Sequence, residues 1–166
     1  MRSLAQPAFP DDDGRADATL AAALEEHGRA PAQTAVLAAV CRARLLVPVV
    51  PVVAVGTAVE HGPAGLIGDQ EADMSAVLMR GRDGREALLA FSSLQRLLQW
   101  DPASRPVPVR AADAARAAST QGAVALLIDV AGPVPFAVAG DDLAQLAAGH
   151  VLVPAGGAYA WAIPAG

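Results

Sequence analysis

The segment MSAVLMRGRDGREALLAFSSLQRLLQW (residues 74–100) decides the fold of this chain of 166 residues. Two apolar runs, 74–79 and 86–91, flank the turn sequence Arg82-Asp83-Gly84. Because Asp-Gly supplies the positive φ that a tight turn needs, the pattern predicts an antiparallel hairpin. Ser92 is expected to cap the helix that follows, with a glutamine three residues later as in a capping box. The segment therefore predicts a strand, a turn, a strand and a helix in succession.

Before this segment, the sequence predicts two helices and a strand. Apolar residues at helical spacing follow Asp17, which is expected to cap a helix that ends at Gly28, and Pro31 is expected to begin a second helix. The β-branched run 45–55 predicts a strand. Its prolines cannot donate to a ladder, so we expect it to lie at a sheet edge or to carry a bulge. Residues 1–16, rich in proline, aspartate and glycine, are expected to form a disordered tail.

After the segment, strands and helices alternate. The near-continuous apolar run 123–130 predicts a central strand covered on both faces. Shorter patterns predict strands at 107–109, 135–139, 151–153 and 158–163, and helices at 111–121 and 141–149. The order of elements favours an α+β fold, with one mixed, largely antiparallel sheet and packed helices. A single domain is expected over residues 17–166, a length that suits one hydrophobic core.

These features, taken in order, resemble the SseB N-terminal domain family (enhanced serine sensitivity protein). The resemblance lies in five features: the Arg82-Asp83-Gly84 turn, the strand running into serine at 88–94, Trp100-Asp101-Pro102, Pro106-Val107-Pro108-Val109, and the buried strand that ends at 128–133. It covers most of the chain. The resemblance implies a cytoplasmic bacterial protein with no established enzymatic activity. It supplies no catalytic residues.

Composition and charge narrow the classes of function. The net charge of −5 argues against non-specific binding to nucleic acid. The longest apolar stretch carries prolines and is too short to span a membrane, so we expect no membrane segment. A lone cysteine, Cys41, allows no intrachain disulfide and fits the reducing cytoplasm.

No motif predicts catalysis, a cofactor or a metal. The histidines lack the spacing of metal ligands, and Cys41 is expected to be a buried, inert thiol. Ser92 and Ser93 follow a strand but lack the flanking glycines of a nucleophile elbow. The acidic stretch 69–73 fails the EF-hand pattern because glycine and glutamate are missing at the required positions. The sequence therefore favours a protein that is not an enzyme.

Two hypotheses about function remain. The first is a non-catalytic binding or interaction module that uses Trp100 together with the strand residues Val49, Val52 and Val53. Its partner would be an unidentified protein or a second copy in a homodimer, since tryptophan and open strand edges are common at interfaces. The alternative is a small-molecule sensor or hydrolase with a site on the 56–73 loop, built from His61, Asp69 and Asp73, because long loops often carry function.

Overall fold

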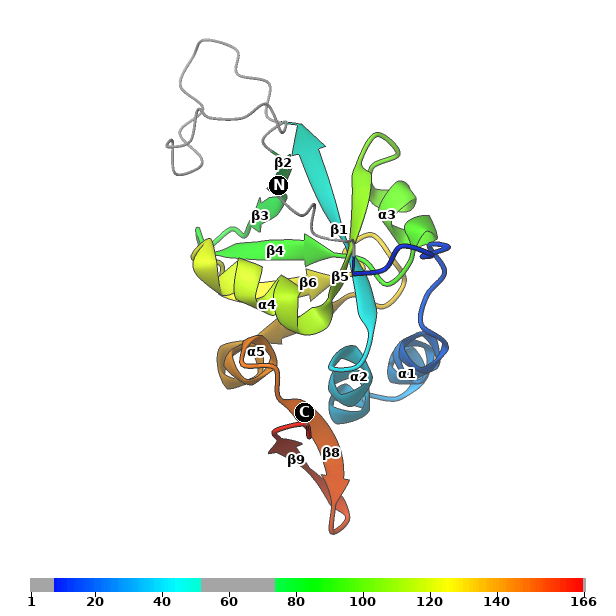
Figure 1. Ribbon diagram of the computed structural model, residues 1–166, viewed down its shortest axis with the longest axis vertical. Helices are drawn as coiled ribbons and strands as arrows, with labels where there is room; N and C mark the ends of the chain where they lie inside the picture. Colours follow the sequence, from blue (N-terminus) through cyan, green and yellow to red (C-terminus); the bar gives the residue numbers. More distant parts are fainter. Residues whose placement is uncertain (1–7, 52–73, 166) are drawn as a thin grey trace, which may run out of the picture.

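The computed structural model describes residues 8–51 and 74–165 (Figure 1). Its helices are α1 (Ala18–Arg29), α2 (Gln33–Val40), α3 (Leu94–Trp100), α4 (Ala111–Thr120) and α5 (Gly140–Ala147). Its strands are β1 (Arg44–Pro51), β2 (Met74–Ala76), β3 (Leu78–Arg80), β4 (Glu86–Ala90), β5 (Arg105–Arg110), β6 (Ala125–Ile128), β7 (Phe136–Ala139), β8 (Val151–Ala155) and β9 (Ala158–Ala162). The predicted α+β class is confirmed. Among these described helices, none combines the length and apolar character needed to cross a membrane.

The larger sheet has the strand order β3–β4–β6–β7. Strands β4 and β6 run parallel, and the outer pairs are antiparallel, including the predicted hairpin of β3 and β4. Helices α4 and α5 pack on one face of this sheet, where alternate residues such as Leu88 and Leu126 enter the main core. Leu89 and Phe91 point to the other face and form a second cluster with Leu97 of α3. Both faces of β4 and β6 are therefore covered, as the unbroken apolar run in β6 predicts.

The described strands form three separate sheets, whereas the order of elements favours one mixed sheet. A second sheet has the order β2–β1–β5, and strands β8 and β9 pair with each other as a separate hairpin. An isolated bridge between Leu46 and Phe91 joins the two larger sheets. Strand β1 lies at the centre of its sheet, so the expectation that it forms an edge is wrong.

The placement of the prolines explains why β1 can be central. Leu46 and Phe91 exchange two backbone hydrogen bonds of 2.8 Å, so the polar groups of Leu46 face that side of β1. In a strand, the backbone N–H and C=O groups of alternate residues point to the same side, so those of Pro48 point to the same side as those of Leu46. The Pro48 nitrogen therefore lies between this bridge and the pairing with β2, which begins at Val49. The missing N–H therefore falls where β1 changes partners, and Pro51 is the last residue of the strand.

Strand β5 lies at one edge of this sheet, and its own prolines protect it. Ala111 donates a backbone hydrogen bond to Ala43 of the β1 side at 3.3 Å. The alternation of an antiparallel ladder then turns Val107 and Val109 toward β1, and Pro106 and Pro108 toward the outside. Proline on the outer side of an edge strand offers no donor to an incoming strand.

The helical hairpin of α1 and α2 differs from the prediction at its corner. Asp17 caps α1 as expected, because its side chain accepts a hydrogen bond from the Leu20 N–H at 3.0 Å. Gly28 does not end the helix. A Cβ at Gly28 would lie 2.7 Å from Cγ2 of Val134, so glycine is required there by a close approach. Helix α2 begins at Gln33, after Pro31, and the Ala32 N–H donates to Nδ1 of His27 at 2.8 Å.

Residues 8–16 contact the domain, although we expected residues 1–16 to form a disordered tail. The Gly14 carbonyl accepts a hydrogen bond from the Leu94 N–H at 2.7 Å. Arg44 forms an ion pair with Asp12 and donates to the carbonyl of Arg15, and both members of the ion pair are almost buried. For the described residues 8–16 the expectation is corrected: Arg44 of β1, which is almost buried, holds this segment in place. Residues 1–7 lie outside the described part.

Candidate functional site

The buried carboxylate of Asp129 joins the ends of the two parallel strands. Asp129 follows β6, and Ser92 follows Phe91 at the end of β4. The Ser92 N–H donates to Oδ1 of Asp129 at 2.8 Å, and the Ser92 hydroxyl donates to Oδ2 at 2.6 Å. Both side chains belong to the small set of polar residues buried in the described part of the chain. We call this pair of hydrogen bonds the Ser92–Asp129 clamp.

The backbone of Asp129 has an uncommon conformation. Its φ of 55° lies in the left-handed region. Among the described residues, Asp129 is the one non-glycine residue with a positive φ. Aspartate tolerates this region better than most residues, because its short polar side chain can bond nearby groups. Burial raises the pKa of Asp129, while the hydrogen bonds from Ser92 and the positive charge of Arg96 oppose that rise. Desolvation is the largest of these influences.

Ser93, the neighbour of Ser92, caps α3. Its side chain accepts a hydrogen bond from the Arg96 N–H at 3.2 Å. The prediction that Ser92 caps this helix is wrong by one position, because the hydroxyl of Ser92 is engaged by a carboxylate 37 residues away in the sequence. Neither serine is exposed, which also separates them from a serine poised at the surface for nucleophilic attack.

A cleft of about 600 Å³ opens beside the clamp, at the carboxyl ends of β4 and β6. In open α/β sheets, ligands bind in the crevice at the carboxyl ends of the parallel strands, and the single parallel pair of this mixed sheet has a crevice at the same place. The lining comes from the start of α3, the segment after β6, and one side of α1: Ala16, Ala21, Leu24, Glu25, Gly28, Arg29, Ser92, Ser93, Gln95, Arg96, Asp129, Pro133 and Val134. We call this space the clamp cleft.

The clamp cleft has an apolar wall and a rim of both charges. Leu24 and Val134 supply part of the wall, and α1 approaches the segment after β6 closely at Gly28. On the rim, Arg29 pairs with Glu25 at 2.5 Å, with both side chains about two-thirds exposed. Arg96 of α3 is half-buried and donates to Gln99 at 3.0 Å. The cleft therefore presents one acidic side chain at its rim, Glu25, two basic side chains, Arg29 and Arg96, and apolar surface.

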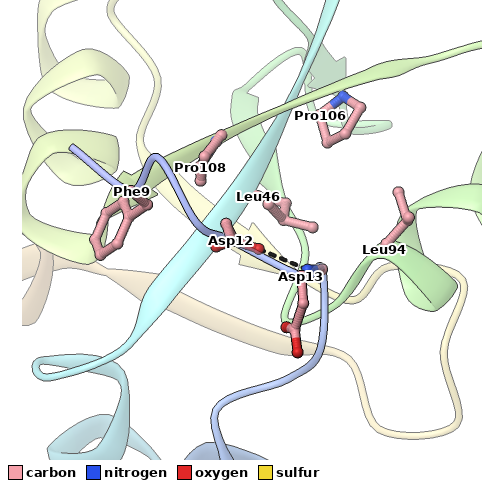
Figure 2. Close-up of a pocket in the computed structure, with 8 residues that line it drawn as sticks. Phe9, Asp12, Asp13, Leu46, Leu94, Pro106 and Pro108 are labelled. Atoms are coloured by element: carbon pink, nitrogen blue, oxygen red, sulfur yellow. Dashed lines mark hydrogen bonds between the residues drawn. The ribbon is translucent and has the colours of Figure 1, made fainter. Parts of the chain in front are cut away.

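A second, smaller cleft of about 260 Å³ lies under the segment 8–16 (Figure 2). Figure 2 shows Phe9, Asp12 and Asp13 on this segment, which line the cleft together with Leu46, Leu94 and the two prolines of β5. The dashed line marks the hydrogen bond from the Gly14 N–H to Asp12 at 2.7 Å. Asp12 is itself paired with Arg44, so this cleft is part of the attachment of the N-terminal segment.

Of the four residues expected to form an interaction surface, Trp100 and Val49 lie in the described part of the chain. Trp100 is half-buried and packs on Phe91, with ring centroids 5.6 Å apart. Val49 is buried in the central strand β1. Val52 and Val53 lie outside the described residues, as do His61, Asp69 and Asp73 of the proposed loop site. The expectation that β1 presents an open edge is wrong, because β5 and β2 flank that strand.

The remaining candidate side chains have local partners. The ring of His27 packs edge-on against Phe136, and His150 contacts Gln145. Cys41 is half-buried, and burial raises its pKa, which disfavours the reactive thiolate at neutral pH. Within the described ranges, no three His, Cys, Asp or Glu side chains gather as metal ligands would.

Sequence reasoning missed the Ser92–Asp129 clamp. Asp129 directly follows a buried strand and precedes Gly132-Pro133, which is a signal for a polar group at the end of a sheet. This signal predicts a contact with Ser92 only when β4 and β6 are known to be parallel neighbours, since their carboxyl ends then lie side by side.

The fold and the clamp cleft define a class: an α+β domain with a mixed sheet and a crevice at the ends of its parallel pair. Comparison with known families is consistent with this class. Residues 18–145 match the family described as SseB protein N-terminal domain, and the chain belongs to that family. No curated protein and no solved structure was found to match the chain.

Proposed function

We propose that this protein is a non-catalytic binding module of the SseB class, and that the clamp cleft receives a short segment of a partner protein. The observation that carries the proposal is the Ser92–Asp129 clamp, with bonds of 2.6 and 2.8 Å at the floor of the cleft. A floor fixed in this way is preorganised, so a ligand meets it without an ordering cost.

The chemistry of the clamp supports binding over catalysis. A serine nucleophile needs a base that accepts its proton and is itself oriented by a third group. Here the Ser92 hydroxyl is buried and donates to Asp129, and burial raises the pKa of that carboxylate mainly by removing water. The pair therefore holds the two strand ends together, and its polar groups satisfy each other.

The rim of the cleft supports a polypeptide ligand. Glu25 and Arg29 are exposed on α1, Gln95 is exposed at the start of α3, and Val134 offers apolar surface between them. Protein interfaces combine an apolar centre with a polar rim, and arginine is enriched in them. A peptide that carries an apolar side chain between an acid and a base would complement this arrangement.

The proposal includes the cytoplasm of a bacterium as the location. Its support is the single free cysteine, Cys41, and the family resemblance. Disulfides form and persist in oxidising compartments, whereas a reducing compartment keeps a lone thiol free.

The test is site-specific photo-crosslinking from the rim of the cleft. A photoreactive amino acid replaces Glu25, whose side chain lines the cleft, in cells that express the protein from its own gene. The expected result is a discrete crosslinked product with one protein. Ala21→Arg, which fills the cleft, should remove that product.

The neighbouring residue supplies the matched control. Ala21 and Ala22 are both exposed alanines on α1, but Ala21 lines the cleft and Ala22 lies outside its lining. Ala22→Arg should leave the crosslinked product unchanged. Equal crosslinking in both variants, or a product formed from Glu26 as readily as from Glu25, would rule out the clamp cleft as the binding site.

A further inference from the structure

The hairpin of β8 and β9 differs in charge from the rest of the chain. The protein carries 12 basic and 17 acidic residues, yet none of them occurs in residues 151–166. The hairpin extends away from the body of the domain, below α2 and α5 in Figure 1. Tyr159 is 40 % exposed and Ile163 is 80 % exposed. A projecting, uncharged, apolar hairpin is the composition expected of a contact surface.

The turn of the hairpin fixes which backbone groups point outward. Gly156 and Gly157 both have positive φ, 57° and 83°, as a two-residue turn of the type I′ class requires. The flanking pair, Ala155 and Ala158, then exchanges hydrogen bonds, and alternate pairs along the ladder do the same. The N–H and C=O groups of Tyr159 and Trp161 therefore point away from β8. Within the described residues, no third strand pairs with this edge.

The outer edge of β9 lacks the protection found on other edges of the protein. On β5 the outward positions hold Pro106 and Pro108, and on β8 one outward position holds Pro154. Strand β9, with the sequence AYAWA, has neither proline nor charge. Proteins normally block an exposed edge with such residues, so an edge left open offers strand pairing to another chain.

We propose that β9 pairs with β9 of a second copy of this chain in a twofold-symmetric antiparallel dimer. The register that uses both outward residues sets Tyr159 opposite Trp161 of the second copy, and Trp161 opposite its Tyr159. Ala160 then faces its own counterpart at the twofold axis. Each Tyr–Trp pair exchanges two backbone hydrogen bonds, and the two hairpins become one β8–β9–β9–β8 sheet.

Three observations favour a second copy as the occupant. The strand carries no charge, so two identical strands meet without repulsion, whereas a partner recognised by charge would find none to bind. Alanine stands at the axis, where opposing Cα atoms come within about 4.5 Å in a non-hydrogen-bonded pair. Pairing would also set Tyr159, which is 40 % exposed, against Trp161 of the second copy and cover part of its apolar surface.

The test places charges at the axis. Ala160 is exposed, and its outward partner in the dimer is Ala160 of the second copy, so Ala160→Arg or Ala160→Asp sets like charges against each other. Light scattering after size-exclusion chromatography should show a dimer for the unmodified protein. In each variant the dissociation constant should rise by roughly tenfold or more. An equimolar mixture of the Arg and Asp variants should restore the dimer as a heterodimer.

A control on the other strand separates this interface from a general effect of charge. Ala155 is also exposed and belongs to β8, where Ala155→Arg should leave the dimer intact. In a Cys41→Ser background, Ala160→Cys should form a disulfide between copies on oxidation, because the expected Cα separation suits that bond. A monomeric unmodified protein at high concentration, or an Ala160→Arg variant that dimerises as well as the unmodified chain, overturns the proposal.

Discussion

Ser92 and Asp129 are joined by two hydrogen bonds, of 2.8 Å from the Ser92 N–H and 2.6 Å from its hydroxyl. They stand directly beyond the last paired residues of the parallel strands, where the Asp129 N–H donates to the carbonyl of Ala90 at 3.0 Å. The side chain of Asp129 thus continues the ladder after the backbone of β6 has turned away. This explains why a carboxylate is tolerated in the interior.

The first prediction concerns the stability that the clamp provides. Ser92→Ala should lower the free energy of unfolding by about 1–2 kcal/mol, because one buried hydrogen bond is lost. Asp129→Ala should cost about 3 kcal/mol, since both Ser92 donors lose their acceptor and alanine strains at a φ of 55°. Urea denaturation of the purified variants measures both values.

A double-mutant cycle separates the clamp from unrelated effects. In the Asp129→Ala background, Ser92→Ala should cost clearly less than it does alone, because its hydroxyl has already lost its acceptor. Ser119 is exposed on α4, and Ser119→Ala should change the stability by less than about 0.5 kcal/mol. Additive losses at positions 92 and 129 would contradict the clamp.

The second prediction concerns pH. Burial raises the pKa of Asp129, so the native state binds a proton more readily than the unfolded chain. The contribution of this group is fully present below its unfolded pKa of about 3.9, and it is lost as the pH rises through the native value. The difference in unfolding free energy between the unmodified protein and Asp129→Asn should therefore shrink as the pH rises from 4. Urea denaturation across a pH series measures it.

Asp83 provides a control of opposite sign. Hydrogen bonds from the backbone N–H and the guanidinium of Arg85 lower the pKa of this exposed carboxylate. Its contribution is present above the unfolded pKa and is lost as the pH falls through the native value. The difference between the unmodified protein and Asp83→Asn should thus shrink toward acid. The same direction at both positions would show that the burial of Asp129 does not control its titration.

The third prediction concerns the close approach of α1 to the segment after β6. Gly28→Ala improves helix propensity, yet its Cβ would lie 2.7 Å from Cγ2 of Val134, a stiff β-branched side chain. We expect a net loss of about 1 kcal/mol, measured by thermal or urea unfolding. In a Val134→Ala background the same substitution should become neutral or stabilising. If Gly28→Ala lowered the stability equally in the Val134→Ala background, the clash with Val134 would not be the cause of the loss.

The parts of the fold that local chemistry determines were predictable from the sequence. The β3–β4 hairpin follows from Asp83-Gly84, where Gly84 has a φ of 82°, and the start of α1 follows from the cap Asp17. Helix α4 and strand β6 follow from their periodicity and apolar runs. Each of these signals lies within a few residues of the structure that it specifies.

The features that the sequence did not predict depend on partners far away in the chain. Strand β1 is central because β2 and β5 flank it. Only this strand order shows that the Pro48 nitrogen faces the point where β1 changes partners, so that its missing N–H breaks no ladder. Ser92 was expected to be a helix cap, because a serine before a helix normally is one. Instead, the Ser92 hydroxyl donates to the carboxylate of Asp129, which lies 37 residues further along the chain. The clamp cleft likewise requires the parallel pairing of β4 with β6.

The fourth prediction concerns the attachment of residues 8–16. Asp12 and Arg44 form an ion pair with side chains only 13 % and 11 % exposed, and Arg44 also donates to the carbonyl of Ser92 at 3.2 Å. Asp12→Ala should cost about 2–3 kcal/mol, since it leaves a buried guanidinium without its carboxylate. The neighbouring Asp13 is exposed and pairs with the exposed Arg15, so Asp13→Ala should change the stability by less than about 0.5 kcal/mol. Limited proteolysis gives an independent readout: Asp12→Ala should speed cleavage within residues 8–16 and Asp13→Ala should not. Equal stability and equal cleavage in the two variants would mean that Arg44 does not hold this segment.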